Sequence, residues 1–199
     1  MDRLKDHLLE RIHGIEFSGE VTSFTDAKWE SLVIVRNAMY EHKIVLVNYT
    51  TYDLRREQDT INPRMHADIL LLLHETDLEL DRHPYWYARV VKIFHVYIRY
   101  YGRDSQSHDL KRIDILFVHW FGQDKAHRSS FSARRLPRIG FIPEEDLDSF
   151  GFLDPNIIIR GVHLILAFSI GQTEELLGPL FAQPEKDGNE DWQAFYVNM

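Results

Sequence analysis

Two stretches decide the fold of this chain: HPYWYARVVKIF at residues 83–94 and RIDILFVHWFG at residues 112–122. In both, large apolar or aromatic residues alternate with polar ones, which is typical of strands that bury one face. The polar residues 101–109 between them form turns readily, so we expect an antiparallel hairpin. Because the paired strands are so rich in aromatic residues and arginine, we expect them to form the middle of a small β-barrel that binds a ligand. We do not expect them to form the framework of an active site.

Further strands are expected on both sides of this hairpin. The segments concerned are short, rich in β-branched and large apolar residues, and bracketed by Pro, Gly or acidic loops. A mainly β fold, α+β overall, is therefore predicted. Strands are expected at 43–53, 67–73, 162–168 and 192–197, and helical turns at 154–156 and 171–177.

The first forty residues are expected to be helical. Residues 2–12 form a short helix that ends near Gly14, and residues 27–40 contain neither Gly nor Pro after Asp26, which can act as an N-cap. After Glu41 the sequence becomes rich in β-branched and aromatic residues. We therefore divide the chain into two parts: a helical extension over residues 1–42 and a β domain over residues 43–199, truncated at its C-terminus because the chain stops inside the last expected strand.

Composition narrows the class of protein. The chain has 199 residues, of which 44% are hydrophobic and 27% charged, values typical of a globular domain. The absence of cysteine excludes disulfides, thiolate catalysis and cysteine-ligated zinc, and it favours an intracellular location. The longest apolar run, residues 69–73, is too short to cross a bilayer, and the N-terminus has no signal-peptide pattern. No membrane partner is expected.

Charge is distributed unevenly along the chain. The net charge is −8. Residues 83–141 carry eleven Lys or Arg and four Asp, which gives +7, whereas residues 1–82 and 142–199 carry −6 and −9. A basic centre of this kind can attract phosphate or acidic peptide locally although the whole molecule is an anion. The alternative is that the acidic flanks neutralise it in the folded state.

The aromatic residues of the hairpin form the first candidate site. Strand alternation places Tyr85 and Tyr87 on one face and Trp86 on the other. If these tyrosines line a pocket, Asp68 or Asp114 on a neighbouring strand can supply the carboxylate of a cage for methylated lysine. The alternative is that most of the aromatic side chains fill the interior of the barrel. We expect at least three of this set in the core: Tyr85, Trp86, Tyr87, Trp120 and Phe121.

The loop at residues 125–138 is the second candidate site. Its basic and hydroxyl side chains make a surface compatible with phosphate and of low sequence specificity, so DNA is a possible partner. The alternative is a solvated loop that pairs with the acidic tail. The candidate nucleic-acid contacts are Lys125, Arg128, Arg134, Arg135 and Arg138.

Enzyme signatures are absent from the sequence. No nucleotide-binding glycine loop, nucleophile elbow or HExxH pattern occurs, so no catalytic residue and no cofactor are assigned. His119 and His127 flank Asp124, but no further ligand is suggested nearby; no metal site is predicted, and His119 is expected to face solvent. Asp114 resembles a nuclease strand carboxylate, which requires at least two more carboxylates close by.

Several motifs resemble a segment found across many mushroom-forming fungi, at the C-terminal end of large transposon-encoded proteins of the KDZ or Plavaka-like type. The resemblance covers nearly the whole chain and implies a piece of a mobile-element protein, without assigning an activity. The matching residues are NYTTYDLRREQD (48–59), HPYWYAR (83–89), WFG (120–122), ARRL (133–136), RIGF (138–141), FGFLDP (150–155) and YVNM (196–199).

The chain is also similar to bromo-adjacent homology (BAH) domains, which are β-barrels of chromatin proteins. Residues 68–70, 87–94, 118–121 and 159–165 follow the order of four characteristic BAH strands. The chain departs from that pattern at Gly122, where an aromatic–Arg pair is usual, and in lacking a Cys before the final strand. The resemblance implies that the 43–199 domain is a BAH-like antiparallel β-barrel.

Together these observations favour a non-enzymatic interaction module of a transposon-derived protein, located in the nucleus. Its expected partner is chromatin, through a histone tail, or another protein. One alternative is a nucleic-acid-binding module that uses the 125–138 loop. A second alternative is a residual metal-dependent nuclease or transposase fragment built around Asp114.

Overall fold

The computed structural model describes residues 2–17, 22–72, 85–105, 107–127, 129, 134–173 and 191–198. It is mainly β, as predicted, and every strand pair in this described part is antiparallel. The elements are α1 (Asp2–His13), α2 (Asp26–Glu30), β1 (Leu32–His42), β2 (Val45–Thr50), β3 (Arg56–Ile61), β4 (Asp68–Leu72), β5 (Tyr85–Tyr100), β6 (Lys111–Gln123), β7 (Arg138–Phe141), β8 (Phe150–Leu153), η2 (Pro155–Ile157), β9 (Ile158–Gly161), β10 (His163–Leu166), β11 (Gln172–Thr173), β12 (Asp191–Trp192) and β13 (Phe195–Asn198).

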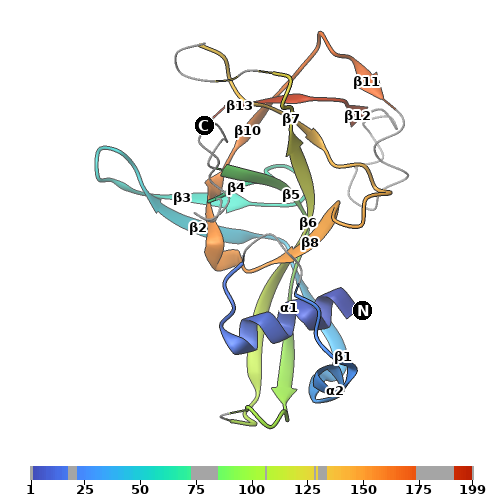
Figure 1. Cartoon of the computed structure of the whole chain (residues 1–199). Helices are drawn as coiled ribbons and strands as arrows, with labels where there is room; N and C mark the ends of the chain where they lie inside the picture. The colour runs from blue at the N-terminus through green and yellow to red at the C-terminus, as the bar shows by residue number, and fades with distance from the viewer. Residues whose placement is uncertain are drawn as a thin grey trace.

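The predicted central hairpin is confirmed as β5 and β6. The two strands pair from Tyr87 opposite Phe121 to Ile98 opposite Lys111, with one irregularity after Val90. At 16 and 13 residues they are longer than expected, and they run through both halves of the molecule (Figure 1). The hairpin is therefore the frame on which the other elements are arranged.

The upper half of Figure 1 is a strongly curled sheet with the strand order β10-β13-β7-β6-β5-β4-β9. Its two terminal strands, β9 and β10, are consecutive in the chain and separated by Val162 alone. The Val162 N–H donates to the Asp68 carbonyl oxygen at 2.9 Å. The sheet thus curls until its first and last strands belong to one continuous segment. The buried side chains of this half are Leu70, Tyr87, Phe121, Ile139, Phe141, Phe195 and Val197.

The lower half is built from β1 and the distal parts of β5 and β6, which α1 covers (Figure 1). Leu8 and Leu9 of α1 are completely buried. Arg11 anchors the same helix through a 2.8 Å ion pair with Asp154. This core joins residues from both sides of position 42, and it consists of Leu4, Leu8, Leu9, Leu32, Phe94, Val96, Ile98, Tyr100, Ile113 and Ile115.

The helix expected over residues 27–40 is wrong. α2 ends at Glu30, and residues 32–42 form β1, which pairs with β5 from Leu32 opposite Tyr100 to His42 opposite Ile93. β-branched side chains favour this extended conformation once a strand with a matching apolar face is available. The pairing of β1 with β5 is interrupted by a bulge between Ile34 and Met39. The polar residues Arg36 and Asn37 lie in this bulge, with positive φ angles of 60° and 48°.

β2 and β3 form a separate two-stranded hairpin that projects from the sheet, on the left of Figure 1. Its base packs on the outer face of the central hairpin, where Trp86 and Trp120 are partly buried beside Phe17. The buried part of this cluster is Val47, Ile61, Ile69, Leu71, Ala88, Val90, Ile93, Leu116, Val118, Leu153 and Ile158.

The remaining expected elements lie toward the C-terminus. The helical turn at 154–156 is confirmed as η2, where the Asp154 side chain accepts a 2.9 Å hydrogen bond from the Asn156 N–H. A helical turn was expected at 171–177. Within it, Gln172–Thr173 is a strand paired with β12, and residues 174–177 lie outside the described residues.

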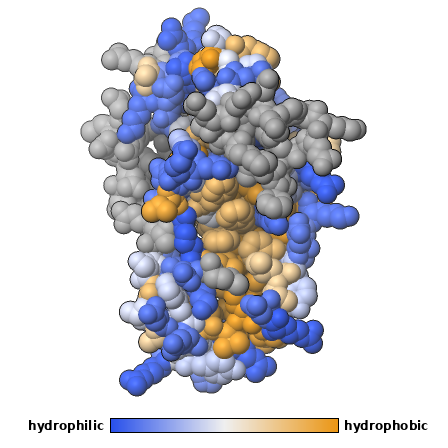
Figure 2. All heavy atoms as spheres, turned by 90° about the vertical axis from the view of Figure 1, so that its right-hand side faces the viewer, coloured by the Kyte–Doolittle hydropathy of each residue, from blue (hydrophilic) through white to orange (hydrophobic). Residues whose placement is uncertain are grey.

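No helix in the described part of the chain is long and apolar enough to cross a membrane. Figure 2 shows hydrophobic side chains gathered on the right-hand face of Figure 1, from the middle to the lower end.

Candidate functional site

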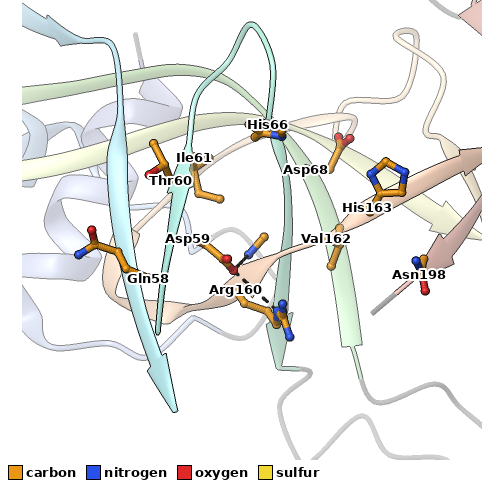
Figure 3. A pocket seen from close by; sticks show the side chains of 11 residues that line it. Gln58, Asp59, Thr60, Ile61, His66, Asp68, Arg160, Val162, His163 and Asn198 are labelled. Atoms are coloured by element: carbon orange, nitrogen blue, oxygen red, sulfur yellow. Dashed lines mark hydrogen bonds and ion pairs between the residues drawn. The ribbon is translucent and has the colours of Figure 1, made fainter. Parts of the chain in front are cut away.

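A pocket of about 530 Å³ lies between the β2–β3 hairpin and the β9–β10 segment (Figure 3). β3 forms one wall, the beginning of β4 and the β9–β10 segment form the other, and the end of β13 closes one side. The lining is mostly polar and carries both signs of charge. It consists of Gln58, Asp59, Thr60, Ile61, His66, Asp68, Arg160, Gly161, Val162, His163 and Asn198.

Both carboxylates of this pocket have partners within the chain. Asp59 accepts a 2.9 Å hydrogen bond from the Gly161 N–H and lies 3.7 Å from Nε of Arg160. The Arg160 guanidinium lies over the Tyr49 ring at 4.6 Å. Figure 3 shows the side chains of Asp59 and Arg160 next to each other, joined by their ion pair. These contacts connect the β2–β3 hairpin to the curled sheet and fix the shape of the pocket.

The second carboxylate, Asp68, holds a cation that belongs to the protein itself. Arg89 donates from Nε and Nη2 to the two oxygens of Asp68, at 2.8 and 3.1 Å. Its guanidinium carbon lies 4.9 Å from the centre of the Phe141 ring and 5.7 Å from those of Phe121 and Phe195. Three aromatic rings therefore surround a cation that is paired with a carboxylate, but the cation is Arg89 of the chain itself.

The tyrosines expected to line the cage belong to the core. Tyr85 and Tyr87 do share a face and Trp86 lies on the other, as predicted. However, Tyr87 is 3% exposed, and burial raises the pKa of its hydroxyl above the ordinary value. Tyr85 is half-buried against the same cluster. The prediction that Tyr87 lines a cage is therefore wrong, because its ring is not accessible to a ligand.

Asp68 and Asp114, the two expected carboxylates, lie in different halves of the molecule. Asp68 is opposite Arg89 on β5, whereas Asp114 is opposite His95, six residues further along that strand. At about 3.3 Å per residue this places them roughly 20 Å apart along β5. Asp114 cannot serve the same cavity as Asp68. It is instead part of a group with His42 and His95, which the sequence did not indicate.

The basic loop is only partly available for phosphate. Arg138 donates from Nε to Oδ2 of Asp124 at 2.8 Å, and its Nη2 forms an ion pair with the same oxygen at 2.6 Å. Burial acts to raise the pKa of Asp124, but its hydrogen bonds, first that from Arg138, lower it overall. Arg138 is therefore neutralised within the loop. Lys125, Arg134 and Arg135 are exposed, and Arg128 lies outside the described residues.

The expected solvent exposure of His119 is wrong. The side chain is 2% exposed, and its ring stacks between those of Phe141 and Phe150 at 4.6 and 4.3 Å. Its Nε2 lies 2.8 Å from the Ile142 carbonyl oxygen, and burial lowers the pKa of the imidazole. His119 therefore belongs to the packed interior. His127 pairs instead with the Leu136 carbonyl oxygen at 3.2 Å.

The tip of the β2–β3 hairpin, residues 51–55, is a feature that sequence reasoning missed. Tyr52 is fully exposed, and Leu54 is 84% exposed. Backbone hydrogen bonds between Thr51 and Arg55 (2.8 Å) and from the Leu54 N–H to the Thr51 carbonyl oxygen (2.9 Å) close the turn, and Asp53 pairs with Arg55 at 2.9 Å. Two large apolar side chains inside a turn of polar residues are the signal that could have identified it.

No protein-family model matches this chain, and comparison with curated proteins and with solved structures finds no significant similarity.

Proposed function

We propose that the chain is a non-enzymatic protein-interaction module with a BAH-like β-barrel, part of a transposon-derived nuclear protein, and that the hairpin tip is its contact surface. The proposal of a barrel is supported by the curled sheet, because its terminal strands β9 and β10 belong to one segment joined by Val162. In a small barrel, closure of the sheet removes the free edges, and a sheet that curls until its terminal strands meet in one segment is consistent with that architecture. The observation that carries the function is the exposure of Tyr52 and Leu54.

The hairpin tip has the properties of a binding anchor. Tyr and other large side chains that enter a partner's pocket account for most of the binding energy in protein interfaces. The closed turn holds Tyr52 and Leu54 in place before binding, which lowers the entropy lost on association. Leu54 has a φ of +62°, an arrangement that costs a non-glycine residue roughly 1–2 kcal/mol and is typical of functional positions.

A partner docked on the tip also reaches the pocket. Gln58, Asp59 and Thr60 on β3 line the pocket and lie on the same hairpin as the tip. The hairpin thus carries an apolar tip at residues 51–55 and polar pocket-lining residues at 58–60. The resemblance to BAH domains makes chromatin the partner class to test first, with the core histones as the protein ligand.

A second candidate, binding of DNA, is favoured by the exposure of Lys125, Arg134 and Arg135. Three exposed cations give weak affinity that falls steeply with salt. Naked DNA is therefore the alternative ligand in the binding experiment.

We expect Tyr52→Ala/Leu54→Ala to weaken binding to reconstituted nucleosomes by about thirtyfold or more, because hot-spot side chains contribute at least about 2 kcal/mol. Thermal stability should change little, since both side chains are exposed. The matched control is Tyr101→Ala/Leu110→Ala, which removes the same residue types at two sites that are each 50% exposed. Binding is measured by biolayer interferometry in 150 mM salt.

Equal binding by wild type and the tip variant would exclude the tip as the contact surface. Binding to naked DNA of the same sequence with equal affinity and a steep salt dependence would support the basic loop instead. If the wild type binds neither nucleosomes nor free histones at micromolar concentration, chromatin is not the partner.

A further inference from the structure

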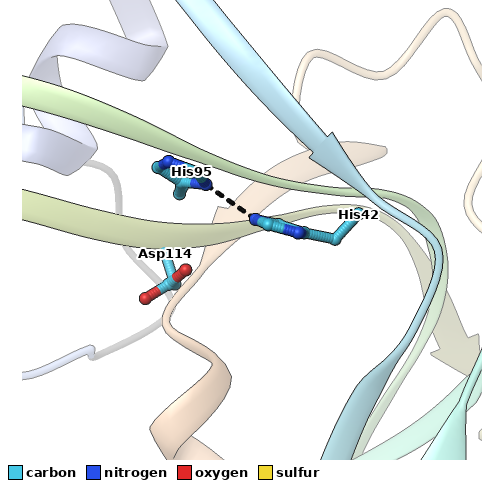
Figure 4. Close-up of side chains that lie close together, drawn as sticks. All are labelled: His42, His95 and Asp114. Atoms are coloured by element: carbon cyan, nitrogen blue, oxygen red, sulfur yellow. Dashed lines mark hydrogen bonds between the residues drawn. The ribbon is translucent and has the colours of Figure 1, made fainter.

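Three metal-ligating side chains meet on the lower half of the molecule, far from the hairpin tip and the pocket. His42 ends β1, His95 lies in the middle of β5 and Asp114 lies on β6, and one potential ligand atom of each falls within 4.8 Å of the other two. Figure 4 shows the two imidazoles joined by a hydrogen bond, with the carboxylate beside them on the next strand.

Strand pairing puts these residues on one face. His95 is directly opposite Asp114 across β5 and β6, and opposite Tyr40 across β5 and β1. His42 is two residues after Tyr40, so it points to the same side of the sheet. That side is opposite the face covered by α1, which contacts the alternate residues Phe94 and Val96.

The distance between the two imidazoles suits a shared metal ion. Nε2 of His42 lies 2.7 Å from Nδ1 of His95. Two nitrogens at about 2.1 Å from one metal ion are about 3.0 Å apart at a right angle and about 3.4 Å apart at the tetrahedral angle. The two nitrogens therefore have to separate by a few tenths of an ångström, and the rings have to turn so that both lone pairs face the ion. The proton that now joins them moves to the other nitrogen of its own ring, which leaves two neutral imidazoles as ligands.

Neighbouring side chains hold the three groups in position. His95 is 7% exposed; its ring stacks on that of Tyr40 at 4.9 Å and meets the edge of the Tyr97 ring at 5.0 Å. Arg112 donates from Nη2 (2.7 Å) and Nε (3.2 Å), in both cases to Oδ1 of Asp114. Such outer contacts orient the ligands of metal sites. The positive charge of Arg112 also lowers the affinity for a cation, so we expect a micromolar site.

We propose that His42, His95 and Asp114 bind one divalent transition-metal ion of the Zn²⁺ type, with water in the remaining coordination positions. Two imidazoles and one carboxylate are a ligand set that Zn²⁺, Co²⁺ and Ni²⁺ accept, whereas Mg²⁺ and Ca²⁺ prefer oxygen ligands alone. The ion would join the last residue of β1 to the central hairpin. This connection lies beyond the bulge at which β1 loses its register with β5.

The test is titration of the EDTA-treated, dialysed full chain with Zn²⁺ by isothermal calorimetry, and with Co²⁺ by visible spectroscopy. We expect one equivalent to bind, with an absorption change that reports imidazole ligation, and the melting temperature to rise with added Zn²⁺. His42→Ala and Asp114→Asn should each weaken this binding at least about tenfold, because even the loss of outer contacts commonly has that effect.

The matched control is His163→Ala, which removes an exposed histidine from the pocket region and should leave the titration unchanged. Circular dichroism checks that each variant is folded; Asp114→Asn is the safer variant because the side chain of Asp114 is 50% exposed and Asn has almost the same shape. One-equivalent binding that persists in both ligand variants would place the ion elsewhere and overturn the proposal. Absence of binding at 100 µM Zn²⁺ would overturn it as well.

Discussion

Gly140→Ala is expected to lower the free energy of unfolding by about 3 kcal/mol, at the upper end of the range for overpacked sites. A Cβ atom at this position would lie 2.6 Å from the Gln193 carbonyl oxygen. Both groups are backbone, one in β7 and the other just before β13, so no side-chain rotation can relieve the contact. The two strands would have to separate next to their paired residues, Phe195 opposite Ile139 and Tyr196 opposite Arg138.

Gly122→Ala is the matched control for this prediction. Gly122 pairs with Gly140 across β6 and β7, but the nearest atom to its added Cβ is Cγ1 of Ile142 at 3.6 Å, an ordinary contact. We expect its free energy of unfolding to change by no more than about 1 kcal/mol. Urea unfolding followed by tryptophan fluorescence measures both variants. Similar stabilities for the two would contradict the close approach of β7 to Gln193.

Asp68→Ala is expected to destabilise the chain by about 2–3 kcal/mol. It leaves the Arg89 guanidinium among three aromatic rings without its counter-ion, and breaking a buried pair typically costs 3–5 kcal/mol. The value is smaller here because the side chain of Arg89 keeps 30% exposure and that of Asp68 15%. The effect is measured by urea unfolding at neutral pH.

Adding Arg89→Met to this variant should restore part of the stability. Removing the cation as well abolishes the unpaired charge, so the double variant should be at least about 1 kcal/mol more stable than the sum of the two single changes predicts. Strictly additive changes would show that Arg89 and Asp68 do not act as a pair. In that case the ring of aromatic side chains would be open to another cation.

The central hairpin could be predicted because its residues alternate with a period of two. The neighbouring strands could be predicted because they are short apolar or β-branched runs bracketed by Pro, Gly or acidic loops, and neither pattern needs knowledge of partners. β1 could not, because the spacing of residues 27–40 fits a helix equally well and the residues of β5 that pair with β1 lie 51 to 68 positions later in the sequence. Tertiary pairing overrides local propensity at such places.

The candidate sites were harder to predict for a related reason. Asp68 was selected as the carboxylate of a cage for methylated lysine, but its partner within the chain, Arg89, became evident only from the register of β4 and β5. His42 and His95 are 53 residues apart in the sequence and meet only because β1 pairs with β5. His119 alternates like a solvent-facing residue, yet Phe141 and Phe150 cover that face.

The proposed contact of the hairpin tip with a core histone is tested most directly by site-specific photo-crosslinking. A benzophenone amino acid replaces Tyr52 in one variant and Tyr101, in the turn after β5, in another, and each is irradiated with reconstituted nucleosomes. We expect a crosslink to a core histone from position 52 and none from position 101. Crosslinks of equal yield from both positions, or a crosslink from position 101 alone, would contradict the assignment of the tip as the interaction surface.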